Sequence, residues 1–203
     1  MKAMRIATIQ QGWPIIVRHI MENGDMVQDE RGSNTMEILN LFVEYTDPEN
    51  AKEPEGNPFG GRKLEAYEDE FTSDDKGDFV YTYGNRYRAH FGFDQIAAVI
   101  GRLTNCAESR RSIAITWDPV EDSKSEEVPC NIYADFKIRK GMLFTTAMWR
   151  SHDIFTAYVP NFFALLRLSQ LVAKWLNIEI GVTTIHSISA HIYEGYWDEA
   201  KKI

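Results

Sequence analysis

Cysteine is scarce in this sequence, and long uninterrupted apolar runs are absent. Cys106 and Cys130 are the only two cysteines among 203 residues, which excludes a disulfide framework and fits a reducing compartment such as the cytoplasm. No CxxC motif or paired Cys/His spacing predicts a zinc site, so we expect no metal. The apolar segments are too short to span a bilayer, and the N-terminal residues do not have the pattern of a signal peptide.

Positive charge is also in short supply. The 22 lysines and arginines against 30 aspartates and glutamates give a net charge of −8, so we expect no general binding to nucleic acid or to an anionic membrane. A small anionic ligand stays compatible, because a few clustered arginines can dominate locally. The hydrophobic content of 44% and charged content of 26% are typical of a globular protein. The length fits one domain over residues 1–203.

The expected elements mix helices with meandering strands. Apolar spacing predicts helices over residues 13–23, 63–71, 93–103 and 161–176. Strands are predicted over residues 5–10, 37–45, 79–88, 112–117, 130–138, 142–148 and 178–188. The helix over 161–176 is apolar on most sides and is expected to be central and buried. Without regular βαβ alternation, the order predicts an α+β fold, with helices packed against one large, mixed, mainly antiparallel sheet.

Cys130 is the first candidate for chemistry. It follows Pro129 at the end of a charged loop, which favours the start of a strand over the middle of the core. If residues 130–138 and 142–148 form a hairpin through Gly141, Cys130 and Arg150 lie near the same end of it. A nearby arginine would lower the pKa of the thiol and raise its thiolate fraction. The alternative is a small buried structural cysteine, which is our default for Cys106.

Several arginines could bind an anion together. Arg31 lies in a loop with a glycine and hydroxyls, and such a loop can cradle a phosphate, although a solvated surface loop is the alternative. Arg110 and Arg111 are adjacent, so in a strand they would point to opposite faces. A dianionic phosphate needs several such donors. A surface salt bridge is the alternative for each arginine alone, Arg150 included.

Three residues in the C-terminal half of the sequence could bind a nucleotide base or a sugar. Asn161 follows Pro160 at the expected start of a helix, so it is an N-cap by default. Its amide could instead bind a pyrimidine edge, because it both donates and accepts. His191 and Tyr193 alternate and can share one face of a strand, or they form a packed aromatic edge.

The order and spacing of the motifs are more specific than any one of them. The motifs are Glu108-Ser109-Arg110-Arg111, Pro129-Cys130, Arg150-Ser151-His152-Asp153, Pro160-Asn161 and His191-Ile192-Tyr193. Tyr83-Gly84-Asn85-Arg86 and the loop Asp29-Glu30-Arg31-Gly32 add to the pattern. Together they resemble the thymidylate synthase family, and most closely its short archaeal and phage-type branch.

The resemblance implies a thymidylate synthase-like fold, a homodimer formed through the sheet face, and a one-carbon transferase (methyltransferase). The substrate would be dUMP and the cosubstrate 5,10-methylenetetrahydrofolate. Cys130 would add to C6 of dUMP, Tyr83 would assist proton removal from C5, and Asp153 would bind near the nucleotide and the pterin. The resemblance also assigns binding groups: phosphate to Arg31, Arg150 and Ser151 with Arg110 and Arg111 of the other subunit, the base edge to Asn161, and the 3′-hydroxyl to His191 and Tyr193.

The sequence also departs from the family pattern. Asn131 follows the cysteine where better-known members have histidine, and Ser189 stands where they have aspartate. The glutamate that organises proton transfer has three candidates, which are Glu65, Glu68 and Glu70. The tryptophan segment that packs on folate and the C-terminal extension that closes over it have no counterpart here.

These departures leave two other functions open. One is a pyrimidine nucleotide hydroxymethylase, in which water instead of hydride captures the methylene intermediate. The other is a catalytically idle nucleotide- or RNA-binding dimer, which the presence of Cys130 beside phosphate-type arginines disfavours.

Overall fold

The computed structural model of the protein describes residues 2–203. Its seven strands form one sheet in the order β1-β3-β7-β6-β5-β4, with β2 also paired to β3. The strands are β1 Lys2–Ile6, β2 Asp25–Gln28, β3 Asn34–Tyr45, β4 Ile113–Ile115, β5 Asn131–Arg139, β6 Met142–Asp153 and β7 Glu179–Tyr193. Two neighbouring pairs, β1–β3 and β6–β7, are parallel and the other pairs are antiparallel. The sheet is therefore mixed and mainly antiparallel, as predicted.

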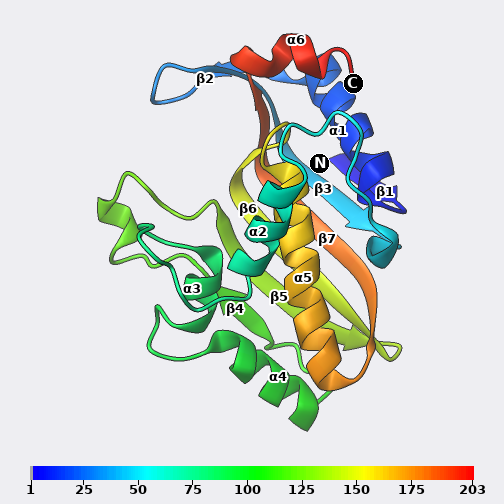
Figure 1. Ribbon diagram of the computed structural model, residues 1–203, viewed down its shortest axis with the longest axis vertical. Coiled ribbons are helices and arrows are strands. Elements are labelled where there is room, and N and C mark those ends of the chain that lie inside the picture. Colours follow the sequence, from blue (N-terminus) through cyan, green and yellow to red (C-terminus); the bar gives the residue numbers. More distant parts are fainter. Residues whose placement is uncertain (1) are drawn as a thin grey trace.

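The helices pack against this sheet and against one another. They are α1 Ile9–Asn23, α2 Arg62–Glu70, α3 Tyr83–Arg88, α4 Gln95–Asn105, α5 Tyr158–Leu176 and α6 Trp197–Ala200. Short 3-10 turns span Pro48–Asn50, Asp122–Lys124 and Glu194–Tyr196. In Figure 1, α5 runs along the sheet and α2 lies in front of it, and α5 contacts α1, α2, α4, β6 and β7. Across residues 2–203, no helix is both long and apolar enough to cross a membrane.

The N-terminal boundaries differ from the prediction. The first strand ends at Ile6 and α1 already begins at Ile9, because Ile9, Trp13 and Ile20 lie at helical spacing and are fully buried. The strand predicted over 178–188 and the His191-Tyr193 pair that follows it are parts of one strand, since β7 continues to Tyr193.

Two further predictions around the site are wrong. Residues 79–88 are not a strand: 79–82 is a loop, and α3 follows because the Thr82 hydroxyl accepts from the backbone N–H of Asn85 at 3.1 Å and caps the helix. Helix α5 begins at Tyr158, so Asn161 is not its N-cap and lies inside the first turn, with Ala157 at the cap position. An asparagine that follows a proline can lie at the N-cap of a helix or inside its first turn. Here the apolar residues before Pro160 are helical, so Asn161 lies inside the first turn.

One rung of the sheet breaks the regular pairing across three strands. The paired residues skip Asn40 of β3, Ile188 of β7 and Arg150 of β6, and Asn40 has a φ of 57°, a left-handed conformation that asparagine tolerates. Trp149 and His152 are three residues apart, yet both are buried and their rings stack 4.8 Å apart. The two-residue alternation therefore shifts at this rung. Past it, the strand ends line a cavity.

Candidate active site

A cavity of about 650 Å³ opens beside the irregular rung. It brings together residues from the loop after β2, the loop before β5, and strands β3, β6 and β7. Its lining includes six residues predicted from the sequence, which are Arg31, Cys130, Arg150, Ser151, His191 and Tyr193. The strand pairings carry this convergence, because Ser151 pairs with Ser189 and Asp153 pairs with His191 across β6 and β7.

Cys130 and Arg150 lie together at the open end of the β5–β6 hairpin. The backbone N–H of Arg150 donates to the Cys130 carbonyl at 2.8 Å, and Arg150 Nη2 lies 3.9 Å from Cys130 Sγ. Arg150 Nε also donates to the Pro129 carbonyl at 2.9 Å, and the guanidinium lies 5.9 Å from the centroid of the Trp117 ring. The predicted pairing of thiol and cation is confirmed.

The predicted effect on the thiol is only partly right. Burial raises the pKa of Cys130, and the opposing effects of Arg150 and Arg31 do not offset it. A cation beside a half-buried sulfur therefore leaves a mainly protonated thiol at neutral pH. Reaction at Cys130 requires that this proton be moved to another group.

A polar edge lines the same cavity as Cys130. Ser189 Oγ donates to Glu37 Oε1 at 2.5 Å and lies 3.2 Å from His191 Nδ1. The rings of His191 and Tyr193 meet edge to face with centroids 5.1 Å apart. Glu37 was missed by the sequence analysis, although it pairs directly with His191 across β3 and β7. The only signal for it in the sequence was a carboxylate at the start of a buried strand.

Tyr83 lies in an adjoining space, not in the larger cavity. A cavity of about 280 Å³ is lined by Tyr67, Glu70, Phe79, Val80, Tyr81, Tyr83 and Glu127. Tyr81 and Glu127 line both cavities. Tyr83 Oη accepts from the backbone N–H of Asn131 at 3.3 Å, and burial raises the Tyr83 pKa well above its usual value, so this phenol stays protonated.

The three candidate glutamates of α2 differ in their surroundings. Glu70 lines the smaller cavity, and burial raises its pKa while the backbone N–H of Tyr83 opposes the rise. Burial also raises the pKa of Glu68, but the largest charge effect on Glu68 comes from Arg167, which lines a different cavity. Glu65 is exposed. Glu70 is thus the candidate nearest to the predicted chemistry.

Asn161 is buried and does not line the larger cavity. It is 4% exposed, and its Oδ1 accepts from Tyr67 Oη at 2.7 Å. Its Nδ2 lies 3.1 Å from His152 Nε2. Tyr67 and His152 were not predicted as site residues, because their contacts with Asn161 depend on how α5 packs on α2 and on β6.

Asp153, the last residue of β6, stabilises the turn that follows this strand. Its Oδ1 accepts from the backbone N–H groups of Phe155 at 2.9 Å and Thr156 at 3.2 Å, and its Oδ2 accepts from Thr156 Oγ1. The carboxylate therefore shapes the entry into α5. The structure does not place it in the cavity lining.

Arg110 and Arg111 lie in a separate cavity. This cavity measures about 670 Å³ and is lined by Ala98, Arg102, Asn105, Cys106, Glu108, Ser109, Arg110 and Arg111. Both arginines are exposed, and Cys106 is exposed as well. Within one chain, these arginines do not join Cys130.

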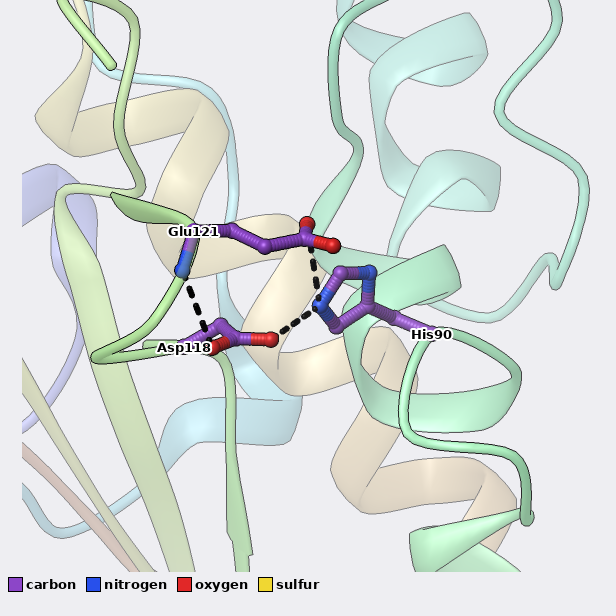
Figure 2. A group of neighbouring side chains, drawn as sticks. All are labelled: His90, Asp118 and Glu121. Atoms are coloured by element: carbon purple, nitrogen blue, oxygen red, sulfur yellow. Dashed lines mark hydrogen bonds and ion pairs between the residues drawn. The ribbon is translucent and has the colours of Figure 1, made fainter. Parts of the chain in front are cut away.

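His90, Asp118 and Glu121 form a group that the sequence analysis missed. Figure 2 shows the two carboxylates converging on one edge of the His90 ring, and their ligand atoms lie within 4.8 Å of one another. Arg86 Nη1, however, lies 3.0 Å from the same His90 Nε2. A guanidinium carries a positive charge and only donates, so its presence beside this nitrogen opposes a metal ion there.

The same arginine explains what the group does instead. Arg86 Nη2 pairs with Asp122 Oδ1 at 2.7 Å, and both side chains are almost fully buried. Asp118 is 2.9 Å from His90, and Asp118 and Asp122 belong to the loop that leads to Cys130. The residues fit an ion-pair network that holds this loop to α3 better than they fit a metal site.

Comparison with known proteins places this geometry in a family. The thymidylate synthase family model matches residues 61–203, more than half of the chain. The chain belongs to the thymidylate synthase family. Members of this family act on dUMP as one-carbon transferases, with methylenetetrahydrofolate as the cosubstrate. The resemblance found in the sequence is confirmed.

Curated relatives match over almost their whole length. A protein of Methanothermobacter marburgensis is 50% identical over 210 residues, which cover 96% of this chain and 94% of the relative. One from Methanothermobacter thermautotrophicus is 49% identical, covering 99% of this chain and 97% of the relative. One from Methanococcoides burtonii is 40% identical, covering 100% and 94%. Each carries the name "Putative thymidylate synthase".

Proposed function

We propose that this protein is a cytoplasmic thymidylate synthase that forms dTMP from dUMP and 5,10-methylenetetrahydrofolate. The observation that carries the proposal is the convergence of Cys130, Arg150 and His191 on one cavity of about 650 Å³. A thiol, a guanidinium and an imidazole from three different segments line this cavity, and they would serve as the nucleophile, a phosphate ligand and a sugar ligand. Cavities of this size accommodate a small ligand.

The nucleotide would be held from both ends. Arg31, Arg150 and Ser151 supply charged and neutral donors for the 5′-phosphate. His191 and Tyr193 lie on the polar edge where the 3′-hydroxyl would be bound. Asn161, in the first turn of α5, would bind the uracil edge, and Asp153 supports this arrangement by fixing the turn before the helix.

The chemistry would begin at sulfur. The Cys130 thiol loses its proton and the sulfur bonds to C6, which places the electron pair on C5 and O4. C5 then bonds to the methylene carbon of the cosubstrate. The bonds from this carbon to the two folate nitrogens break in turn, and loss of the C5 proton drives the second cleavage, which leaves an exocyclic methylene on C5. A hydride from the tetrahydrofolate then reduces this methylene to methyl, and the resulting enolate expels the Cys130 sulfur from C6, leaving dTMP and dihydrofolate. We assign the C5 proton to Glu70, with Tyr83 as the intervening donor, because burial raises the Glu70 pKa toward the working range of a general base.

A homodimer would complete the site. The sheet face away from α5 carries exposed Leu39, Ile113 and Ile115, and Phe144 and Val182 on the same face are only half-buried. Exposed apolar side chains on one face of a sheet are the kind of surface that a second copy of the chain would cover. In such a dimer Arg110 and Arg111, which lie apart from Cys130 in one chain, would contribute to the phosphate site of the partner.

A hydroxymethylase is the second candidate. Phe79 is 69% exposed and Val80 is 56% exposed at the wall of the smaller cavity. With this wall open, water could reach the exocyclic methylene before hydride does. The first steps at Cys130 would be the same.

Product analysis separates the two reactions. The protein is incubated with dUMP and methylenetetrahydrofolate, the nucleotide is identified by mass spectrometry, and dihydrofolate is followed by absorbance. A methyl product with dihydrofolate supports a thymidylate synthase, and a hydroxymethyl product without dihydrofolate supports the alternative. The absence of both products, together with no covalent adduct of 5-fluoro-dUMP, would refute both proposals.

A further inference from the structure

A chain of hydrogen bonds runs from Tyr67 into the core. Tyr67 Oη donates to Asn161 Oδ1 at 2.7 Å, and Asn161 Nδ2 lies 3.1 Å from His152 Nε2. His152 Nδ1 lies 2.9 Å from Ser187 Oγ. The chain joins α2, α5, β6 and β7, and it passes through the Asn161 amide that the proposed function assigns to the uracil edge.

The direction of this chain determines which way the Asn161 amide faces. Burial and the nearby His191 lower the His152 pKa well below its usual value, so the imidazole is neutral and has one acceptor nitrogen. With Nε2 as that acceptor, Asn161 Nδ2 donates to it and the His152 Nδ1–H donates to Ser187. Asn161 Oδ1 then faces Tyr67.

The Tyr67 hydroxyl holds the chain in this direction. Burial raises the Tyr67 pKa well above its usual value, with a further rise from Glu70, so the phenol carries a hydrogen that needs an acceptor. In the described part of the chain, Asn161 Oδ1 accepts it. If the amide were flipped, Nδ2 would face Tyr67 and this hydrogen would lose its acceptor in a buried place, which is costly.

The Asn161 amide, held in this orientation, can still form a limited number of hydrogen bonds with a ligand. A primary amide offers two N–H groups and two oxygen lone pairs. His152 and Tyr67 take one of each, which leaves one N–H and one lone pair for a ligand. Uracil presents an acceptor at O4 beside a donor at N3–H, and this pair matches the remaining groups. Cytosine presents the reverse order of donor and acceptor, at N4 and N3.

We propose that Tyr67 is a positioning residue that makes the site selective for uracil over cytosine, by holding the Asn161 amide in one orientation. This inference rests on the proposed function, because it assumes that Asn161 meets the base. It assigns the selectivity to a residue of α2 that lies outside the larger cavity. Without the Tyr67 hydroxyl, the amide can turn at little cost and accept the cytosine edge.

The test compares two phenol-to-phenyl substitutions by calorimetric titration with dUMP and dCMP. Tyr67→Phe should reduce the ratio of the dCMP to the dUMP dissociation constant by about tenfold, as expected for the loss of one buried hydrogen bond. Tyr45→Phe is the matched control. The Tyr45 hydroxyl lies 3.0 Å from the Tyr158 hydroxyl, so this change removes the same atom from a buried pair at the start of α5. It should leave the ratio unchanged.

The possible outcomes are distinct. An equal loss of affinity for both nucleotides in Tyr67→Phe, or an unchanged ratio, would overturn the inference and leave the proposed function standing. A change of ratio in Tyr45→Phe as large as that in Tyr67→Phe would also overturn it, since the effect would then be a general one on α5. If the wild-type protein binds neither nucleotide and forms no adduct with 5-fluoro-dUMP, the proposed function fails and the inference fails with it.

Discussion

Two cavities of similar volume each combine arginines with a cysteine, but they differ in what surrounds the sulfur. The cavity of about 650 Å³ holds Cys130 half-buried, with Arg150 Nη2 at 3.9 Å. The cavity of about 670 Å³ holds Cys106 exposed at the end of α4, beside Arg110 and Arg111. The first is built on paired strand ends, and the second lies on a helix end and a loop.

The difference shows that residue types alone do not define a site. Cys130 shares its cavity with a polar edge of Glu37, Ser189 and His191, so a ligand there can meet polar groups other than the thiol and its arginine. The cavity beside Cys106 is lined by α4 and the loop after it, and among residues 2–203 no comparable polar edge lines it. We propose that this second cavity is half of a site, which another copy of the chain would complete.

The largest expected effect separates the two thiols. Cys130→Ser should reduce dTMP formation by on the order of 10³-fold or more, because the nucleophile is lost. Cys106→Ser should change the rate by less than about twofold, since an exposed side chain outside the reacting groups is replaced by one of similar size. The rates are measured by dihydrofolate absorbance, and adduct formation with 5-fluoro-dUMP is checked by mass spectrometry. Equal losses in the two variants would show that the assignment of Cys130 is wrong.

The contrast between the cavities also explains what the sequence could predict. The hairpin of β5 and β6 has its turn glycine and alternating strands in the local sequence, so the proximity of Cys130 and Arg150 followed from counting residues. The Arg110-Arg111 pair was recognised as a motif, but its distance from Cys130 depends on how α4 and β4 are placed.

The parts that were missed depend on tertiary packing. The segment 79–88 has aromatic residues typical of a strand, yet Thr82 caps a helix there and Gly84 packs so closely on α2 that an added Cβ would lie 2.0 Å from the Glu70 carbonyl oxygen. Glu37 and Tyr67 reach the site through contacts between residues far apart in the chain. No local sequence pattern encodes such contacts. They follow from the register between the strands and from the packing of the helices, which only the three-dimensional structure gives.

The second prediction tests whether the half site serves a partner subunit. The double substitution Arg110→Ala and Arg111→Ala should reduce dTMP formation by about 10²-fold, because a dianionic phosphate loses two charged donors. Mixing this variant with Cys130→Ser should then restore activity. In a mixed dimer one site receives Cys130 from one chain and both arginines from the other.

The proportion of mixed dimers sets the activity that this experiment should restore, and each variant alone is the control. Random reassociation gives about a quarter of the wild-type activity in a dimer with two shared sites. Each inactive variant incubated alone under the same conditions should stay inactive. If the mixture stays inactive although mixed dimers are detected by native mass spectrometry, the arginines do not act across the interface.

The third prediction concerns the protonation of the two sulfurs. Burial raises the pKa of Cys130, so near pH 7 its alkylation by iodoacetamide should be roughly tenfold slower than that of exposed Cys106. The alkylation rate of Cys130 should continue to increase with pH above the range in which an ordinary thiol loses its proton. Arg150→Gln removes the charge that lowers the Cys130 pKa most. In this variant the rise of the Cys130 alkylation rate should therefore occur at still higher pH. Peptide mass spectrometry follows both sites in one sample, and a faster reaction at Cys130 in Arg150→Gln would contradict the proposed electrostatics.

The smallest expected effect lies at the turn that aligns the first cavity. Lys140 and Gly141 have φ values of 53° and 76°, which a two-residue hairpin of type I′ requires at both positions. Asparagine adopts a positive φ more readily than lysine, so Lys140→Asn should stabilise the protein by a few tenths of a kcal/mol and raise Tm by about 1–2 °C.

Gly141→Ala is the matched control with the opposite expected effect. It places a side chain at a position with positive φ and should destabilise the protein by about 1 kcal/mol. Thermal unfolding measures both changes. The turn lies at the far end of β5 and β6 from Cys130 and Arg150, and the register between these strands is fixed by their pairing along most of their length. The alkylation rates of both thiols should therefore stay the same in Lys140→Asn. A change at Cys130 alone would show that the turn, and not the strand pairing, holds the thiol beside its arginine.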